Sequence, residues 1–147
     1  MRPPFYKDPD FYRRQTLWFI LGAILLVVNR YLLPVGAAVP GGPSLTYNEL
    51  DALIQSKVQP VLGVLFGVGT IIELYAAADY HGRAQQRSSA LAVVIISFII
   101  LGVGLLFIVP HPRPGFFVPV LVAILNLMAH RGVSRDLARL KNMDRLR

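Results

Sequence analysis

The sequence contains no cysteine, and only 16% of its 147 residues are charged. Without cysteine the chain cannot form disulfides, bind a metal through thiolates or use a cysteine nucleophile. Soluble domains carry about 25% charged residues. The shortage of charge, together with 54% hydrophobic residues, is typical of a protein that lies in lipid.

Motifs that carry catalysis or hold cofactors are also absent. The chain has no Gly-x-Ser-x-Gly, no phosphate-cradling glycine loop, no His-Glu-x-x-His and no haem-attachment signature. Its three histidines, His81, His111 and His130, do not recur at metal-ligand spacing. The sequence therefore predicts a non-enzymatic protein with no metal and no cofactor.

Four apolar runs are candidates for membrane helices. A crossing helix needs about 20 apolar residues. The runs over residues 16–33, 58–80 and 89–109 meet this requirement, whereas the run over residues 116–130 is short. On length alone the fourth run is a crossing, a re-entrant segment or a buried helix.

The distribution of basic residues favours a fourth crossing. Basic residues concentrate on the cytoplasmic side of membrane proteins. The N-terminal segment, the loop after the second run and the C-terminal tail together hold 12 of the 15 basic residues. Four crossings put all 12 on one side, so we predict an all-α integral membrane protein of the cell (inner or plasma) membrane. It is a four-transmembrane-helix bundle with both termini in the cytoplasm.

The predicted segments follow the chain in order. They are a cytoplasmic arm (1–15), a first span (16–33), an outer connection (34–57), a second span (58–80), a cytoplasmic loop (81–88), a third span (89–109), an outer loop (110–115), a fourth span (116–130) and a basic cytoplasmic tail (131–147).

The outer connection begins as a segment rich in Gly, Pro and Ala, which we expect to be irregular. Thr46 and Glu49 then form a capping-box pattern, which predicts a short helix over residues 46–57. Two interpretations of this helix stay open. It lies on the outer surface as an amphipathic helix that breaks at Pro60, or it is the early start of the second span, kinked at Pro60.

The tail predicts a basic amphipathic helix with Ser134 as its N-cap. Val133, Leu137 and Leu140 fall on one side of it. We expect it to lie against the anionic headgroups of the inner leaflet, although a solvated tail or docking on a partner protein fits the same pattern. The predicted headgroup contacts are Arg13, Arg14, Arg83, Arg87, Arg131, Arg135, Arg139 and Lys141.

Glu73 is the acidic residue inside the second apolar run, and Asp79 lies at the end of that run. An ionised carboxylate is costly in hydrocarbon, so this residue is expected to be paired, hydrated or protonated. The same helix carries Gly63, Gly67 and Gly69, which predict a face that packs closely on neighbouring helices.

Two polar residues of the fourth run have the depth of Glu73. The second and fourth spans run in the same direction, and Asn126 and His130 lie four residues apart near the cytoplasmic end. We therefore predict an intramembrane polar cluster of Glu73, Asn126 and His130. Asn29 and Arg30, near the outer end of the first run, are interpreted as groups that snorkel to the interface.

Two functions remain open for this cluster and this chain. The first is a non-catalytic accessory or structural subunit of a larger membrane complex, in which Glu73 fixes helix register. The alternative is a small proton- or cation-coupled transporter or channel that acts as an oligomer through Glu73. The expected partners are anionic lipid and other membrane subunits or further copies of the chain, with no nucleic acid.

Overall fold

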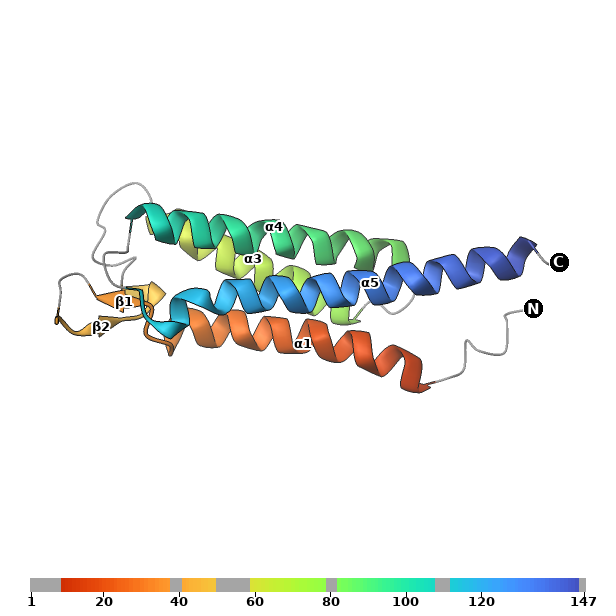
Figure 1. Cartoon of the computed structure of the whole chain (residues 1–147), viewed down its shortest axis with the longest axis horizontal. Helices are drawn as coiled ribbons and strands as arrows, with labels where there is room; N and C mark the ends of the chain where they lie inside the picture. Colours follow the sequence, from red (N-terminus) through yellow and green to blue (C-terminus); the bar gives the residue numbers. More distant parts are fainter. Residues whose placement is uncertain (1–8, 38–40, 50–58, 79–81, 108–111, 146–147) are drawn as a thin grey trace.

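The computed structural model describes residues 9–37, 41–49, 59–78, 82–107 and 112–145, without the side chains of residues 9–14, 59–60 and 107. Four long helices make up most of this part and lie side by side as a bundle (Figure 1). They are α1 (Pro9–Tyr31), α3 (Gln59–Ala78), α4 (Arg83–Phe107) and α5 (Val118–Arg145). A short 3₁₀ helix, η2 (Pro114–Phe117), precedes α5.

Each long helix packs against two others, in the order α1, α3, α4, α5 and back to α1. Consecutive helices run in opposite directions, so the start of α1 and the end of α5 lie at the same end of the bundle (Figure 1). We call this end the tail end and the opposite one the strand end. In this square arrangement α3 and α5 face each other across a diagonal.

Among the described residues, three helical segments are long and apolar enough to cross a membrane: Val61–Ala78, Arg83–Leu106 and Pro114–Arg145. Large apolar side chains point outward from them, including Ile71, which is 67% exposed, and Ile95, which is 60% exposed. The chain is therefore a helical membrane protein, because such a surface is stable only in lipid. The apolar stretch of α1, Gln15–Tyr31, is shorter than these three.

The fourth apolar run, which was expected to be the shortest span, lies within the longest described helix. α5 continues through the predicted tail as one helix of 28 residues, and Ser134 lies in its interior rather than at an N-cap. The tail is helical but does not turn to form a separate helix. Hydrophobicity stops near Ala129, but Leu, Ala, Arg and Lys are all good helix formers, so the backbone has no reason to stop there.

Two other boundaries also differ from the predictions. α4 begins at Arg83, so most of the predicted loop over residues 81–88 is helix. α1 begins at Pro9, within the predicted arm over residues 1–15. Both helices therefore extend further than their apolar runs.

At the strand end, the first connection is more regular than predicted. Strand β1 (Gly36–Ala37) pairs antiparallel with β2 (Ser44–Leu45). The backbone N–H of Arg113 donates to the carbonyl of Val35 at 2.8 Å, and that of Gly115 donates to Pro34 at 3.1 Å. A Cβ at Gly115 would lie 2.5 Å from the Pro34 oxygen, so only glycine permits this approach. The two connections are therefore joined.

The capping box of the first connection forms. The Thr46 backbone N–H donates to Glu49 Oε2 at 2.7 Å, and the Glu49 N–H donates to Thr46 Oγ1 at 3.3 Å. The Thr46 hydroxyl also donates to Glu49 Oε2 at 3.0 Å, and the two bonds that the carboxylate accepts from Thr46 lower the pKa of Glu49. Residues 47–49 are helical, whereas the rest of the predicted helix over residues 46–57 lies outside the described residues, as does its junction with Pro60.

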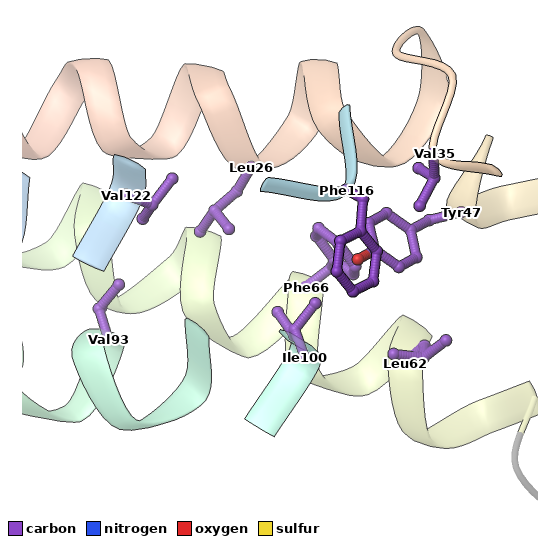
Figure 2. Close-up of a cluster of buried hydrophobic side chains, with 9 residues drawn as sticks. All are labelled: Leu26, Val35, Tyr47, Leu62, Phe66, Val93, Ile100, Phe116 and Val122. Carbon is purple, nitrogen blue, oxygen red and sulfur yellow. The ribbon is translucent and has the colours of Figure 1, made fainter. Parts of the chain in front are cut away.

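The hydrophobic core continues from the strand end into the bundle (Figure 2). Tyr47 of the first connection is fully buried, and its ring lies 5.1 Å from that of Phe66 in α3. The Phe116 ring of η2 gathers with them (Figure 2). These three aromatic rings close the strand end of the bundle, and burial raises the pKa of the Tyr47 hydroxyl.

Candidate functional site

A buried polar pair lies at the centre of the bundle. Glu73 of α3 and Asn126 of α5 are both inaccessible to solvent, at 0% and 1% exposed. Asn126 Nδ2 donates to Glu73 Oε1 at 2.6 Å and to the carbonyl of Val122 at 3.0 Å. The first bond joins two helices that are not neighbours, so it passes through the middle of the bundle.

Gly22 of α1 makes room for this pair. A Cβ at position 22 would overlap Glu73 Oε1 and lie 2.8 Å from Glu73 Cδ. The carboxyl group therefore occupies the volume that any other residue at position 22 would fill. Sequence reasoning missed Gly22, although it lies on the same helical face as the buried residues Phe19 and Leu26.

Several polar atoms of this core lack a hydrogen-bond partner among the described residues. They are Glu73 Oε2, Asn126 Oδ1, Ser97 Oγ and both amide atoms of Asn29. A buried acceptor left unpaired costs about 1–3 kcal/mol. The pair therefore lacks a hydrogen-bond donor. Protonation of the carboxyl group, a water molecule or a small cation could satisfy these unpaired acceptors.

His130, the third member of the predicted cluster, has another partner. It lies one helical turn beyond Asn126, at a half-buried position, and its Nε2 accepts a hydrogen bond of 3.3 Å from Arg87 Nε of α4. The structure therefore brings Glu73 and Asn126 together, whereas His130 takes part in a separate contact between α4 and α5.

The three predicted packing glycines have different surroundings. A Cβ at Gly69 would lie 3.2 Å from Leu26 of α1 and 3.5 Å from Ile96 of α4, so Gly69 lies between two helices. A Cβ at Gly63 would lie 3.2 Å from the Arg30 guanidinium. Gly67 is exposed, and a Cβ there meets nothing within 4 Å among the described residues, so its predicted packing within the chain is wrong.

We expected Asn29 and Arg30 to snorkel outward to the interface, and the structure differs from this expectation. Asn29 is fully buried, and Arg30 is half-buried with its Cζ 5.6 Å from the centre of the Phe66 ring. Asn29 follows Leu26 by three residues and Gly22 by seven, so helical periodicity places it on the core-facing side of α1. That periodicity was the signal for its burial.

At the tail end a second buried acid connects α1 with α5. Gln15 Nε2 donates to Asp136 Oδ2 at 2.7 Å, and Asp136 is 5% exposed. A Cβ at Gly132 would lie 3.1 Å from Gln15 Nε2, so glycine lets the two helices approach. Burial raises the pKa of Asp136, although Gln15, Arg83 and Arg139 act in the opposite direction.

The predicted headgroup contacts are mostly exposed positions at this end. Arg87, Arg131, Arg135, Arg139 and Lys141 are exposed, and Arg83 is half-buried. The side chains of Arg13 and Arg14 lie outside the described residues. Within the part of the chain that the structure describes, no group of three or more His, Asp or Glu side chains is arranged to hold a metal ion.

Comparison with protein families places the chain in one of them. Residues 11–146 match the family described as a domain of unknown function, DUF4293, and the chain belongs to that family. No curated protein and no solved structure matches the chain.

Proposed function

We propose that this chain is a non-catalytic accessory subunit of a larger membrane complex. In this proposal it crosses the cell membrane four times, and both ends of the chain are cytoplasmic. The observation that carries the proposal is that α5 continues beyond the rest of the bundle at the tail end (Figure 1).

The length of α5 exceeds what a membrane requires. At 1.5 Å per residue its 28 residues extend about 42 Å, whereas the hydrocarbon layer is about 30 Å thick. Exposed arginine is excluded from hydrocarbon, so Arg131 marks the boundary on the tail side. The headgroup layer adds about 5–7 Å on each side. For a helix along the membrane normal, Arg139 is then about 12 Å past the boundary and beyond the headgroups.

The part of α5 beyond Arg131 contacts α1 at its base and carries a basic surface. The Gln15–Asp136 hydrogen bond ties it to α1 at its base. Arg131, Arg135 and Arg139 are exposed and four residues apart, so they form one stripe along the helix. A basic stripe on a continuous helix that reaches past the lipid headgroups fits an acidic surface on another protein.

The partner is tested by purification in a mild detergent. The wild-type chain should bring a stoichiometric partner, and the double variant Arg135→Glu/Arg139→Glu should lose it while keeping its helical content. Arg113→Glu is the matched control, because Arg113 is exposed at the opposite end and should retain the partner. A wild-type chain that purifies as a lone monomer or homo-oligomer would contradict the proposal.

The four crossings have an independent test, which the absence of cysteine makes direct. Single cysteines replace Asp10, Arg113 and Asn142 and are treated with a membrane-impermeant maleimide. Positions 10 and 142 should react only in inverted vesicles, and position 113 only in intact cells. Reaction of position 10 in intact cells would mean that α1 does not cross.

A second candidate function rests on Glu73 itself. Glu73 Oε2 and Asn126 Oδ1 are buried without partners among the described residues, which is the arrangement expected of a site that takes up a proton or cation. In this case the chain is a small proton- or cation-coupled transporter or channel that acts as an oligomer. Glu73→Gln should then abolish flux in reconstituted vesicles while assembly is intact. Unchanged flux would rule this function out.

A further inference from the structure

The hydrogen bonds of Asn126 fix the orientation of its amide. Nδ2 has two hydrogens, and it donates one to Glu73 Oε1 and the other to the carbonyl of Val122. A flipped amide would instead set its oxygen against two acceptors. Asn126 Oδ1 therefore belongs to an amide whose donors are both used, and it must be matched by a donor from another group.

The carboxyl group of Glu73 presents the complementary deficiency. Oε1 accepts from Asn126, whereas Oε2 has no partner among the described residues. An ionised carboxylate has only acceptors, so Glu73 Oε2 and Asn126 Oδ1 cannot satisfy each other in that state. One proton on Oε2 converts it into the donor that Oδ1 lacks.

The charged groups on the neighbouring helices have other contacts. On α1, Arg30 lies beside Gly63, which is ten residues from Glu73 along α3. On α4, Arg87 donates to His130 of α5, one turn nearer the tail end than Asn126. On α1, Gly22 also packs against the carboxyl, and it has no side chain that could carry a charge.

We infer that the Glu73–Asn126 pair is a proton-binding site, in which neutral Glu73 donates Oε2–H to Asn126 Oδ1 while Asn126 Nδ2 donates to Glu73 Oε1. The acid and the amide then form a ring of two hydrogen bonds, and every polar atom of the pair has a partner. Burial favours this state because a neutral acid carries a far smaller desolvation cost than a carboxylate. The inference does not depend on either proposed function, since a subunit and a transporter can both contain such a pair.

The composition of the chain offers a direct test, because Glu49 and Glu73 are its only glutamates. Full-length protein with ¹³C-labelled glutamate is examined by NMR in lipid bicelles at neutral pH. Glu49 is exposed and its carboxylate is stabilised by Thr46, so it provides the internal reference for an ionised group. The Glu49→Gln variant assigns the two signals.

We expect the carboxyl carbon of Glu73 to resonate as a carboxylic acid and that of Glu49 as a carboxylate. Two carboxylate signals would overturn the inference, whether the missing donor is then water or a cation. Glu73→Gln gives an independent check, because a glutamine amide can make the same two hydrogen bonds to Asn126. Its thermal midpoint should stay close to that of the wild type, and a variant that fails to fold would overturn the paired arrangement.

Discussion

Replacing Gly22 with alanine should destabilise the bundle through the Glu73–Asn126 pair. The added Cβ would overlap Glu73 Oε1, so the carboxyl must move and its bond to Asn126 must lengthen or break. Overpacking costs about 1–3 kcal/mol. An unpaired buried polar group costs about 1–3 kcal/mol more. Alanine gains about 1 kcal/mol over glycine inside a helix. The net loss is therefore about 1–5 kcal/mol, from the same three effects.

Gly67→Ala is the matched control for this prediction. Gly67 also lies inside a membrane helix, but a Cβ there meets nothing within 4 Å among the described residues. This variant should gain up to about 1 kcal/mol from helix propensity alone. Unfolding in SDS, followed by circular dichroism, measures both variants. Adding Glu73→Asp to Gly22→Ala shortens the acid by one methylene and should recover part of the loss. Equal stabilities for Gly22→Ala and Gly67→Ala would refute the reasoning.

Three further predictions concern the two ends of the bundle. Tyr47→Phe should leave the free energy of unfolding unchanged or raise it by up to about 1 kcal/mol, since the hydroxyl has no partner among the described residues, whereas Tyr47→Ala should cost about 3–5 kcal/mol, both measured in the SDS titration. Gly115→Ala should cost about 1–3 kcal/mol because its Cβ would meet the Pro34 carbonyl, and stability equal to that of Gly102→Ala, which meets nothing within 4 Å in the described part, would argue against this. Burial raises the pKa of Asp136, so the stabilisation that this carboxyl contributes is complete below about pH 4 and is lost as pH rises through the raised pKa. The stability of the wild type should therefore fall relative to that of Asp136→Asn over this pH range. Parallel pH profiles of the thermal midpoint for the two proteins would contradict this prediction.

The sequence predicted that Glu73 lies at the depth of Asn126 and His130, but it could not show which of these two residues contacts Glu73. Helix direction and apolar length give depth, because each residue adds a fixed rise. Which helices face each other is decided by packing, and the sequence offered His130 as readily as Asn126. The order α1, α3, α4, α5 around the bundle puts Glu73 opposite Asn126 and leaves His130 to Arg87.

The ends of the helices were not predicted correctly, because hydrophobicity indicates which residues lie in the membrane and does not indicate where a helix begins or ends. In α5 the apolar run stops near Ala129, whereas the helix continues to Arg145 on residues that favour helix without favouring lipid. The strands β1 and β2 have two residues each, too few for any alternation to appear in the sequence. Gly115 permits the close approach that joins the two connections. That a side chain at this position would collide with Pro34 is visible only in the structure.

The backbone hydrogen bonds from Arg113 to Val35 and from Gly115 to Pro34 join the α1–α3 hairpin to the α4–α5 hairpin. The two helical hairpins are clamped at the strand end, where backbone atoms join them. At the tail end the chain leads from α3 directly to α4, and the Gln15–Asp136 hydrogen bond joins α1 to α5. Because α5 is the longest described helix and extends beyond the others at the tail end (Figure 1), a small rotation at the strand end displaces the tip of α5 most. Distances between paired spin labels should be narrowly distributed at the strand end and broader toward Arg139, and equal widths would show that the bundle is rigid throughout.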